Sequence, residues 1–570
     1  MSSFFSGLFL ADPILRRWTL ERLRKRWPAD EGFLAGHPPY LPELPGMESA
    51  NMPDRWRDLP GEAPAQRSVS LSLPGQKLEV DATDVRGLFV ARGLDQDAVG
   101  QGLQAFTWLA LDPGLDPHWV TALWQGWAAH HGLPDAGSSA WTAAVAARRA
   151  LNMLDYAERV GVPLPKAENL ARLAAHAAII AQGLDWREDG SHDTRLIVEG
   201  AALARLGMVF AMPQHAEAGF TLLAEEAKRQ FGTSGLISQG STHHHLLAVQ
   251  DYLGVWLEAR RLGHARAAEL ESIVRRLLTP IPALCINGQL PWVGDLAADF
   301  PPAFSLGLLP EAAADQGWLG QLPEVERARV VALRDQSRQN DLEALRADGW
   351  LRQTVGPWSG LWHAFPGGWS PVKGYGHADL GSCTLHYEGV PVFVDPGNGA
   401  EGGEGRAYRS AAAHGGLTLN DGDPYPRNRA VYSNAFRRDA GGKPPLLQAE
   451  YDGVSCVFEG YSHCLGHNEV QRRWQVEGSR LRIRDVVNGT GRVRVARRLI
   501  TELHVTLEEG AAILTAPSFR LKVSAEVPAV LQPGKVWTAW GECSAANAIT
   551  FTARRNLPWQ GEIIVEPLPL

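Results

Sequence analysis

Apolar residues recur at the spacing of an α-helix between about residue 100 and about residue 345. The pattern is clearest in WTAAVAARRALNMLDYAERVG, AENLARLAAHAAIIAQGL, TRLIVEGAALARLGMVF, HAEAGFTLLAEEAKRQFG and HHHLLAVQDYLGVWLEARRLG. Several of these segments end at glycine, and only short loops separate them. Such a run of helices predicts an α/α assembly, either a solenoid or a closed toroid. No strict sequence repeat is visible, so the pattern favours neither form.

The periodicity changes near residue 350, where short alternating segments replace the helical pattern. They read TLHYEGVPVFVD, LLQAEYDGVSCVFEGY, QRRWQVEGSRLRIRDVV and RLITELHVTLEEG, with Glu-Gly, Asp-Gly and Gly-Ser at the turns. Two-residue turns of this kind connect antiparallel strands. We therefore predict an antiparallel β-sandwich for residues 349–570.

The chain before the helical pattern is expected to be irregular over residues 1–95, with one short hairpin in RSVSLSLPGQKLEV. A length of 570 residues is too great for one ordinary core. The predicted fold class is multidomain α+β. It consists of an N-terminal segment (1–95) packing on the helical domain, the helical domain (96–348) and the sandwich (349–570).

The composition of the chain narrows the classes of function that it can have. The chain is 45% hydrophobic and 21% charged, which is typical of a globular protein. Its formal net charge of −8 argues against nucleic-acid binding, which usually needs a basic face. An acidic glycan can still bind through a local basic cleft. A minority of the 20 tryptophans are expected to stack on sugar rings, because most tryptophans are expected to be buried.

The location of the protein is inferred from its cysteines and its N-terminus. The cysteines have no CxxC spacing and indicate neither a disulfide framework nor a metal site. They are Cys285, Cys383, Cys456, Cys464 and Cys543. The N-terminal sequence is a poor signal peptide, because its apolar stretch precedes the positive charges, and no later run has the length of a membrane span. We expect a cytoplasmic protein; a periplasmic location, a peripheral amphipathic anchor at residues 4–26 and a homodimer are left open.

Three residues of metal-binding type lie in GYGHADLGSCTLHYEGVPVFVDPGNGAEGGEGRAYRSAAAH, at residues 374–414. His377 lies in the GHAD turn, Asp395 ends an apolar run, and His414 follows a glycine-rich loop. Two imidazoles and a carboxylate suit Zn²⁺, which accepts water in a fourth position. The alternative is a hairpin with a hydrogen-bonded histidine and an ordinary turn aspartate, because ligands this far apart form no compact motif.

The same stretch resembles the C-terminal part of the heparinase II/III superfamily of polysaccharide lyases. GYGHAD, VFVDPG and YRSAAAHGG correspond to the family's G-H-x-H-A/N-D turn, L-x-D-P-G strand end and R-S-T-x-A-H-N segment. The resemblance implies an incomplete α/α toroid before the sandwich. It also implies one structural zinc ion held by His377, Asp395 and His414. The first histidine of the family's turn is a proposed catalytic residue, and Tyr375 takes its place here.

A lyase of this kind removes the C5 proton of a uronate, neutralises its carboxylate and protonates the leaving O4. DGSHDTRLIVEG looks like the family stretch that neutralises the carboxylate, which assigns this role to His192 and Arg195. Their spacing of three residues puts them on one face if the helix has already begun. The alternative is a helix cap formed by Ser191 and Asp193 beside a solvated arginine.

ISQGSTHHHLLAVQDYL resembles the family's E-x-S-x-x-Y-H-x-x-x-L-x-x-L helix, whose tyrosine is the catalytic acid and often the base. Aligning the Leu-Leu pair puts His244 at the tyrosine position and Gln239 at the acidic one. Histidine transfers protons near neutral pH, so we expect His244 and Tyr375 to share proton abstraction and donation. Three consecutive helical histidines point in three directions and cannot bind one metal ion together. A structural or surface cluster is the alternative.

Two further stretches supply residues for substrate binding. NGQLPWVGDLAAD resembles the family's G-x-x-P-x-x-G-D loop at the cleft rim, and RAYRS lies beside the metal loop. The expected substrate-binding residues are Gln239, Trp292, Asp295, Arg406, Tyr408 and Arg409. A solvated turn is the alternative for both stretches.

The sequence thus predicts a polysaccharide or oligosaccharide lyase that cleaves a uronate-containing acidic glycan by β-elimination and carries one structural Zn²⁺. Two alternatives stay open. One is a glycoside hydrolase on the same scaffold, which needs paired carboxylates. The other is a non-catalytic glycan-binding protein that has lost the family's tyrosine and histidine.

Overall fold

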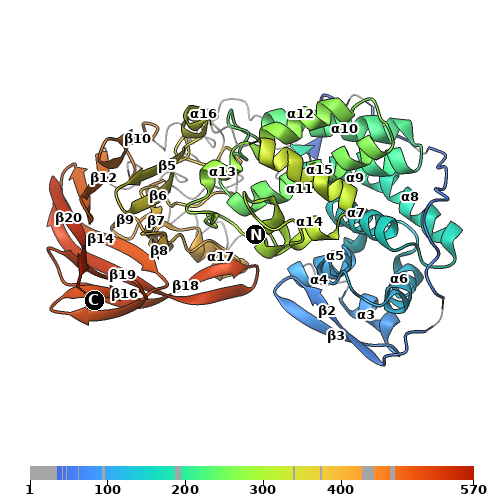
Figure 1. The fold of residues 1–570 in the computed structure, drawn as a ribbon, viewed down its shortest axis with the longest axis horizontal. Helices are drawn as coiled ribbons and strands as arrows, with labels where there is room; N and C mark the ends of the chain where they lie inside the picture. Colours follow the sequence, from blue (N-terminus) through green and yellow to red (C-terminus); the bar gives the residue numbers. More distant parts are fainter. Residues whose placement is uncertain are drawn as a thin grey trace, which may run out of the picture.

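The computed structural model describes residues 35–569 apart from a number of segments. Those left out are 37, 42, 47, 62, 93–96, 136, 185, 188–193, 338–340, 373–374, 426–441 and 462–468. Figure 1 shows a helical part and a β part that lie side by side along the longest axis of the molecule. The predicted succession of a helical region and antiparallel sheets is therefore confirmed.

An antiparallel hairpin of β2 (Ser68–Leu73) and β3 (Gln76–Asp81) lies near the start of the described chain, where the sequence predicts it. The next segment was expected to be irregular but forms helix α3 (Val85–Arg92). Val85 and Phe89 are four residues apart and both buried, so even this short segment has an apolar face. That face packs against α6 (Pro117–His131), which explains why the segment is helical.

The helical part continues through many short and medium helices. They are α4 (Ala98–Gln104), α5 (Trp108–Leu111), α7 (Ala143–Arg159), α8 (Lys166–Gln182), α9 (Arg195–Val209), α10 (Pro213–Arg229), α11 (Thr242–Arg261), α12 (Ala267–Leu278), α13 (Ile281–Leu284), α14 (Gly317–Gln321), α15 (Glu324–Gln336) and α16 (Leu342–Ala347). Short 3-10 helices are η1 (Ser139–Trp141), η2 (Pro302–Leu308) and η3 (Ala411–Ala413). Within the described ranges, no helix is both long enough and apolar enough to cross a membrane.

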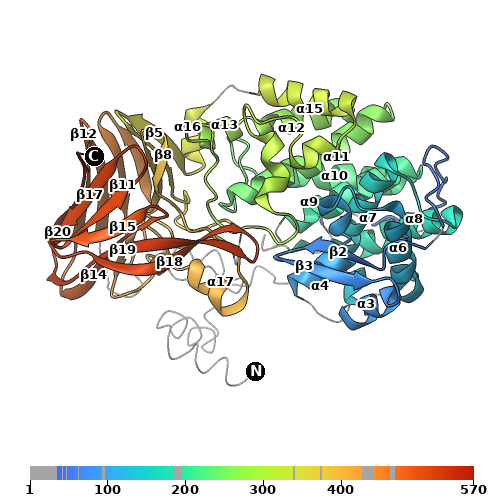
Figure 2. The ribbon, with the colours of Figure 1, turned by 60° about the horizontal axis from the view of Figure 1, so that its bottom comes forward.

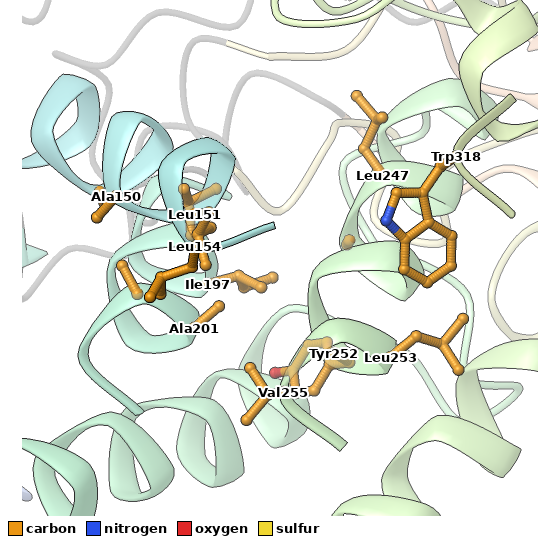
Figure 3. Close-up of a cluster of buried hydrophobic side chains, with 14 of the residues drawn as sticks. Ala150, Leu151, Leu154, Ile197, Ala201, Leu247, Tyr252, Leu253, Val255 and Trp318 are labelled. Atoms are coloured by element: carbon orange, nitrogen blue, oxygen red, sulfur yellow. The ribbon is translucent and has the colours of Figure 1, made fainter. Parts of the chain in front are cut away.

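Helix α9 lies at the centre of the helical part, in contact with α7, α8, α10 and α11. Thirteen of its 15 residues are buried, so it presents apolar surface on nearly all sides. Helix α10 can approach α9 closely because Gly219 of α10 has no side chain. A Cβ on Gly219 would lie 2.2 Å from the backbone nitrogen of Ala204 in α9. Figure 3 shows the apolar side chains that α7, α9 and α11 contribute to this core, with Trp318 nearby.

The β part, as far as the structure describes it, consists of three antiparallel sheets. Their orders are β5-β6-β7-β8, β10-β11-β12-β13-β20-β17-β16-β15 and β18-β19-β14-β9. The strands are β5 (Trp350–Val355), β6 (Trp358–His363), β7 (Cys383–Tyr387), β8 (Val390–Phe393), β9 (Leu417–Leu419), β10 (Leu446–Glu450), β11 (Gly453–Phe458), β12 (Glu469–Glu477), β13 (Arg480–Asn488), β14 (Arg492–Thr501), β15 (His504–Glu508), β16 (Ala511–Thr515), β17 (Arg520–Ala525), β18 (Val530–Ala539), β19 (Glu542–Asn556) and β20 (Trp559–Leu568). A separate pair joins β1 (Ala35–Gly36) to β4 (Trp186–Arg187).

The turns and faces of these sheets follow the sequence pattern. Glu388 and Gly389 connect β7 to β8, and both have positive φ (49° and 84°), as a two-residue hairpin turn requires. In β13 the buried residues alternate with more exposed ones along the strand. Most of the buried side chains pack into one apolar core shared by strands of all three sheets, and a small separate cluster lies on β14, β18 and β19.

The helical and β parts make several contacts among the described residues, and two of them border the site described below. In the first, Asp295 and Asn398 form an isolated parallel bridge, and the Leu296 N–H donates to the Asn398 carbonyl at 2.8 Å. In the second, the β18–β19 hairpin extends from the β part to the turn between β2 and β3, as Figure 2 shows. The cleft described below lies between these two contacts.

Candidate active site

A cleft with a volume of about 270 Å³ lies between the helical part and the β part. Helices α7, α9 and α11 and the loop after α13 form one side of it. The turn before β7, the segment after α17 (Gly402–Tyr408) and the tip of the β18–β19 hairpin form the other. The predicted site residues that line the cleft are Arg195, His244, Asp295, Tyr375 and Arg409. These residues come from five stretches that lie far apart in the sequence.

Arg195 is the first residue of α9, and its side chain is exposed at the cleft. The preceding Thr194 makes no side-chain capping hydrogen bond. The positive end of the helix dipole and the guanidinium therefore both favour an anion at this end of the cleft. His192 lies outside the described residues, so its role stays a prediction.

The three consecutive histidines of α11 have three different environments. His243 and His245 are fully buried; burial lowers the pKa of His243 to about 3 and that of His245 to about 4. Nδ1 of His243 accepts from the Ala297 N–H at 3.1 Å, and Nε2 of His245 is 3.0 Å from the Leu277 carbonyl. His244 is only partly buried and lines the cleft. It is therefore the histidine available for proton transfer.

The position of His244 is fixed by the start of its helix. Ser241 is the N-cap of α11, and its hydroxyl accepts from the His244 N–H at 3.0 Å. The same hydroxyl donates to the carbonyl of Asp295 at 2.6 Å. The side-chain nitrogen of Gln239 contacts Nδ1 of His244. Ser241 therefore links His244, the candidate proton-transfer group, to the loop that contains Asp295 by hydrogen bonds.

Asp295 connects the cleft to the β part. Its Oδ1 accepts from Nε2 of His377 (3.1 Å), Nδ2 of Asn398 (2.6 Å) and Nε of Arg409 (2.9 Å). Burial alone would raise the pKa of Asp295, but His377 and Arg409 hold it well below its usual range. This carboxylate therefore stays ionised and fixes Arg409 at the cleft, where Tyr375 also lies.

His377, Asp395 and His414 form a candidate metal site. All three are buried, and one ligand atom from each lies within 4.8 Å of the others. Nδ1 of His414 is 2.8 Å from Oδ2 of Asp395, and the two imidazole rings are 5.1 Å apart. Nδ1 of His377 is buried without a hydrogen-bond partner. An orphaned nitrogen beside an imidazole and a carboxylate fits a borderline-soft divalent cation. The predicted group can hold a metal ion.

The carboxylates around His414 favour positive charge at this cluster. Burial alone would lower the pKa of His414, but Asp395 and Asp379 raise it to about 9. Its Nε2 is 2.9 Å from the Tyr408 carbonyl, which leaves Nδ1 directed at Asp395. A bound metal would displace the proton from Nδ1, since a ligating histidine is neutral.

Four predicted substrate-binding residues do not line the cleft among the residues that the structure describes: Gln239, Trp292, Arg406 and Tyr408. Gln239 is buried against His244, and Trp292 packs on the ring of His243. Arg406 is exposed on α17, whereas Arg409, directly after the end of this helix, donates to Asp295. The Tyr408 ring packs edge-on against Trp537. These residues support their neighbours or face outward.

The structure adds cleft residues that the sequence motifs do not contain. Arg148 of α7 makes a bidentate ion pair with Asp251 of α11, at 2.8 and 3.1 Å, and its Nε is 3.3 Å from Asp299. Both helices bury further polar residues, such as Asn152 on α7 and Gln250 on α11, so nothing in the sequence singles out this pair. Trp540, at the tip of the β18–β19 hairpin, also lines the cleft.

Comparisons with known proteins agree with this architecture. Residues 338–556 match the family model described as "Heparinase II/III-like, C-terminal". No curated protein matches the sequence. A crystal structure of heparinase III is similar with a TM-score of 0.57 and 14% identity, over 83% of this chain and 76% of that chain. A mutant heparan sulfate lyase from Pedobacter heparinus has a TM-score of 0.52 and 15% identity, over 83% and 77%.

A third solved structure, a heparinase III gene product, has a TM-score of 0.53 and 15% identity, over 83% of this chain and 80% of that chain. At such low identities these similarities show the fold. They confirm the prediction of an α/α toroid followed by an antiparallel β-sandwich.

Proposed function

We propose that this protein, whose C-terminal domain belongs to the heparinase II/III-like family, is a lyase that cleaves a uronate-containing acidic glycan by β-elimination. The observation that carries the proposal is the convergence of Arg195, His244 and Tyr375 on one cleft. A cation, an imidazole and a phenol are the groups that this elimination needs. The resemblance to solved lyases supports the class of reaction and leaves the glycan open.

The proposed mechanism assigns one role to each group. Arg195, at the positive end of α9, pairs with the uronate carboxylate and lowers the energy of the charge that develops when C5 loses its proton. His244 and Tyr375 share the removal of that proton and the protonation of O4 as the C4–O4 bond breaks. Arg409, held by Asp295, keeps a second positive charge at the cleft beside Tyr375.

The metal in this proposal is one structural Zn²⁺, held by His377, Asp395 and His414. His377, Asp395 and His414 would hold the ion, which would supply a structural cross-link between the turn before β7, the segment after β8 and the segment before β9, and no group for the elimination itself. The residues act on the cleft indirectly, because His377 bonds to Asp295, which in turn holds Arg409.

A hydrolase on the same scaffold is the second candidate, because Asp251, Asp295 and Asp299 line the cleft and glycosidases use paired carboxylates. Asp251 and Asp299 are both paired with Arg148. Asp295 is held ionised by His377 and Arg409, so it is not a proton donor. These pairings favour the lyase.

The experiment that tests the proposal is a screen of the purified protein against alginate, glycosaminoglycans and bacterial exopolysaccharides. Ultraviolet absorbance detects the unsaturated uronate that elimination creates, and a reducing-sugar assay detects any cleavage. Absorbance that rises together with reducing ends supports the lyase. Reducing ends without absorbance would support the hydrolase, and glycan binding with neither signal would support a binding protein.

A further inference from the structure

Trp540 occupies the turn between β18 and β19 and is partly buried. It lines the same cleft as Arg195, His244 and Tyr375. Among the cleft-lining residues of the described chain, it is the one tryptophan. The β18–β19 hairpin brings it there from the far end of the sequence, as Figure 2 shows for the strand β18. An aromatic residue is thus placed at the same cleft as the candidate proton-transfer groups.

The backbone around Trp540 is held on two sides. On one side, the Gly541 N–H donates to the Gly399 carbonyl at 2.7 Å, and the Trp537 N–H donates to the Pro396 carbonyl at 2.8 Å. This loop directly follows the metal ligand Asp395. The hairpin is therefore anchored to the metal-binding segment of the β part.

On the other side, the hairpin tip touches the turn between β2 and β3. A Cβ on Gly541 would lie 2.8 Å from Cα of Gly75, and a Cβ on Gly75 would lie 3.0 Å from the carbonyl oxygen of Trp540. Both glycines have positive φ, 74° and 67°, which favours glycine at each position. The two backbones approach so closely that Trp540 is fixed between the two parts of the protein.

We propose that Trp540 forms a sugar-binding subsite, in which the indole face stacks on a pyranose ring next to the scissile bond. This inference rests on the proposed function, which identifies the stacked ring as a sugar of a uronate-containing glycan. The C–H groups on one face of a pyranose make the same kind of contact with an indole that apolar side chains make. Arg195 attracts the carboxylate while Trp540 binds the ring, so affinity does not depend on charge alone.

The test compares Trp540→Ala and Trp540→Phe with the wild type on tetrasaccharides prepared from alginate, hyaluronan and heparan sulfate. Turnover is followed by ultraviolet absorbance and binding by calorimetry. Tyr451→Ala is the matched control, because Tyr451 is a completely exposed aromatic residue in the turn between β10 and β11. Trp540→Ala is expected to raise KM and Kd about tenfold. Its kcat is expected to stay within about threefold of wild type, since a stacking contact of this kind acts on substrate and transition state alike.

Trp540→Phe keeps a flat aromatic face and is expected to restore most of the affinity, which a purely structural role of the side chain would not predict. Gly75→Ala supplies an independent variant, because Gly75 does not line the cleft and its added methyl would displace the Trp540 carbonyl. It is expected to raise KM with little change in kcat. Thermal melting of each variant identifies any that fails to fold, and Trp540→Phe then remains as the test.

The outcomes separate this inference from the proposed function. If Trp540→Ala is an active lyase with the KM and Kd of the wild type, the proposed subsite is wrong and the proposed function stands. Weaker binding by Trp540→Ala in a protein that forms no unsaturated product would support the subsite and contradict the lyase. A wild type that neither binds nor cleaves any of the three tetrasaccharides would overturn both.

Discussion

Oδ1 of Asp295 lies 3.1 Å from Nε2 of His377, so a carboxylate of the helical part holds a histidine of the candidate metal site. Nε2 of His377 donates this hydrogen bond, and Nδ1 is buried without a hydrogen-bond partner, which makes Nδ1 the nitrogen available to a metal ion. The same oxygen accepts from Arg409 at the cleft. Oδ1 of Asp295 therefore binds a residue of the candidate metal site and a residue of the cleft, at the junction of the helical and β parts.

Asp295→Asn is expected to lower zinc affinity by roughly 10- to 100-fold, because the carboxylate that orients His377 and increases its basicity is lost. Competition with a chromophoric chelator measures this affinity. Asp299→Asn is the control, since Asp299 lines the same cleft and pairs with Arg148. Equal zinc affinities for wild type and Asp295→Asn would show that the hydrogen bond does not orient a metal ligand.

The purified protein is expected to contain about one zinc ion per chain, as the single three-residue site of the described chain allows. His414→Ala should lower the melting temperature more than it lowers affinity for sugar, because a structural metal contributes to folding. Metal analysis and calorimetry measure both quantities. His504→Ala, at an exposed histidine of β15, is the control. Metal-free protein as stable as the original would refute a structural metal.

His244→Ala and Tyr375→Phe should each reduce turnover by roughly 10²- to 10⁴-fold, because each removes a proton-transfer group. The double variant should lose much less than the product of the two effects, since the groups act in one step. Initial rates on an active substrate provide the measurement, with His504→Ala again as the control. Activity near wild type in both single variants would place the catalytic groups elsewhere.

Acid should destabilise the protein in part through His245. Burial holds its pKa near 4 in the folded state, from a usual value of 6.5, so the unfolded chain binds the proton more readily. Stability contributed by neutral His245 is complete above pH 6.5 and is lost as the pH falls toward about 4. His245→Gln, which keeps a donor for the Leu277 carbonyl, should reduce the fall in melting temperature between those pH values. An unchanged fall would exclude His245 as a cause.

The local pattern of apolar and polar residues was sufficient to predict the architecture. The change from helical to alternating spacing marks the transition between α16 and β5, and the turn dipeptides mark hairpins such as the one at Gly389. Residue type and spacing left the metal cluster open, and the family resemblance implied the grouping of His377, Asp395 and His414 that the structure brings together. Helix α3 was missed because its eight residues give little periodicity, and its contact with α6 decides its conformation.

Directions of side chains across the cleft could not be predicted. RAYRS contains both Arg406 and Arg409, and only the structure shows that Arg409 reaches Asp295 while Arg406 is exposed. Trp540 and Arg148 lie outside every motif, and each reaches the cleft through tertiary packing of a hairpin or a helix. Such long-range contacts have no local signal in the sequence.

The central claim is that the cleft breaks a glycan by elimination at His244 and Tyr375. The most direct measurement is the mass of the products formed from a defined uronate tetrasaccharide by the wild type and by the His244→Ala/Tyr375→Phe variant. The account predicts that the wild type releases a fragment one water molecule lighter than the saturated sugar and that the double variant releases almost none. Fragments of saturated mass from the wild type, or equal amounts of unsaturated fragment from both proteins, would contradict it.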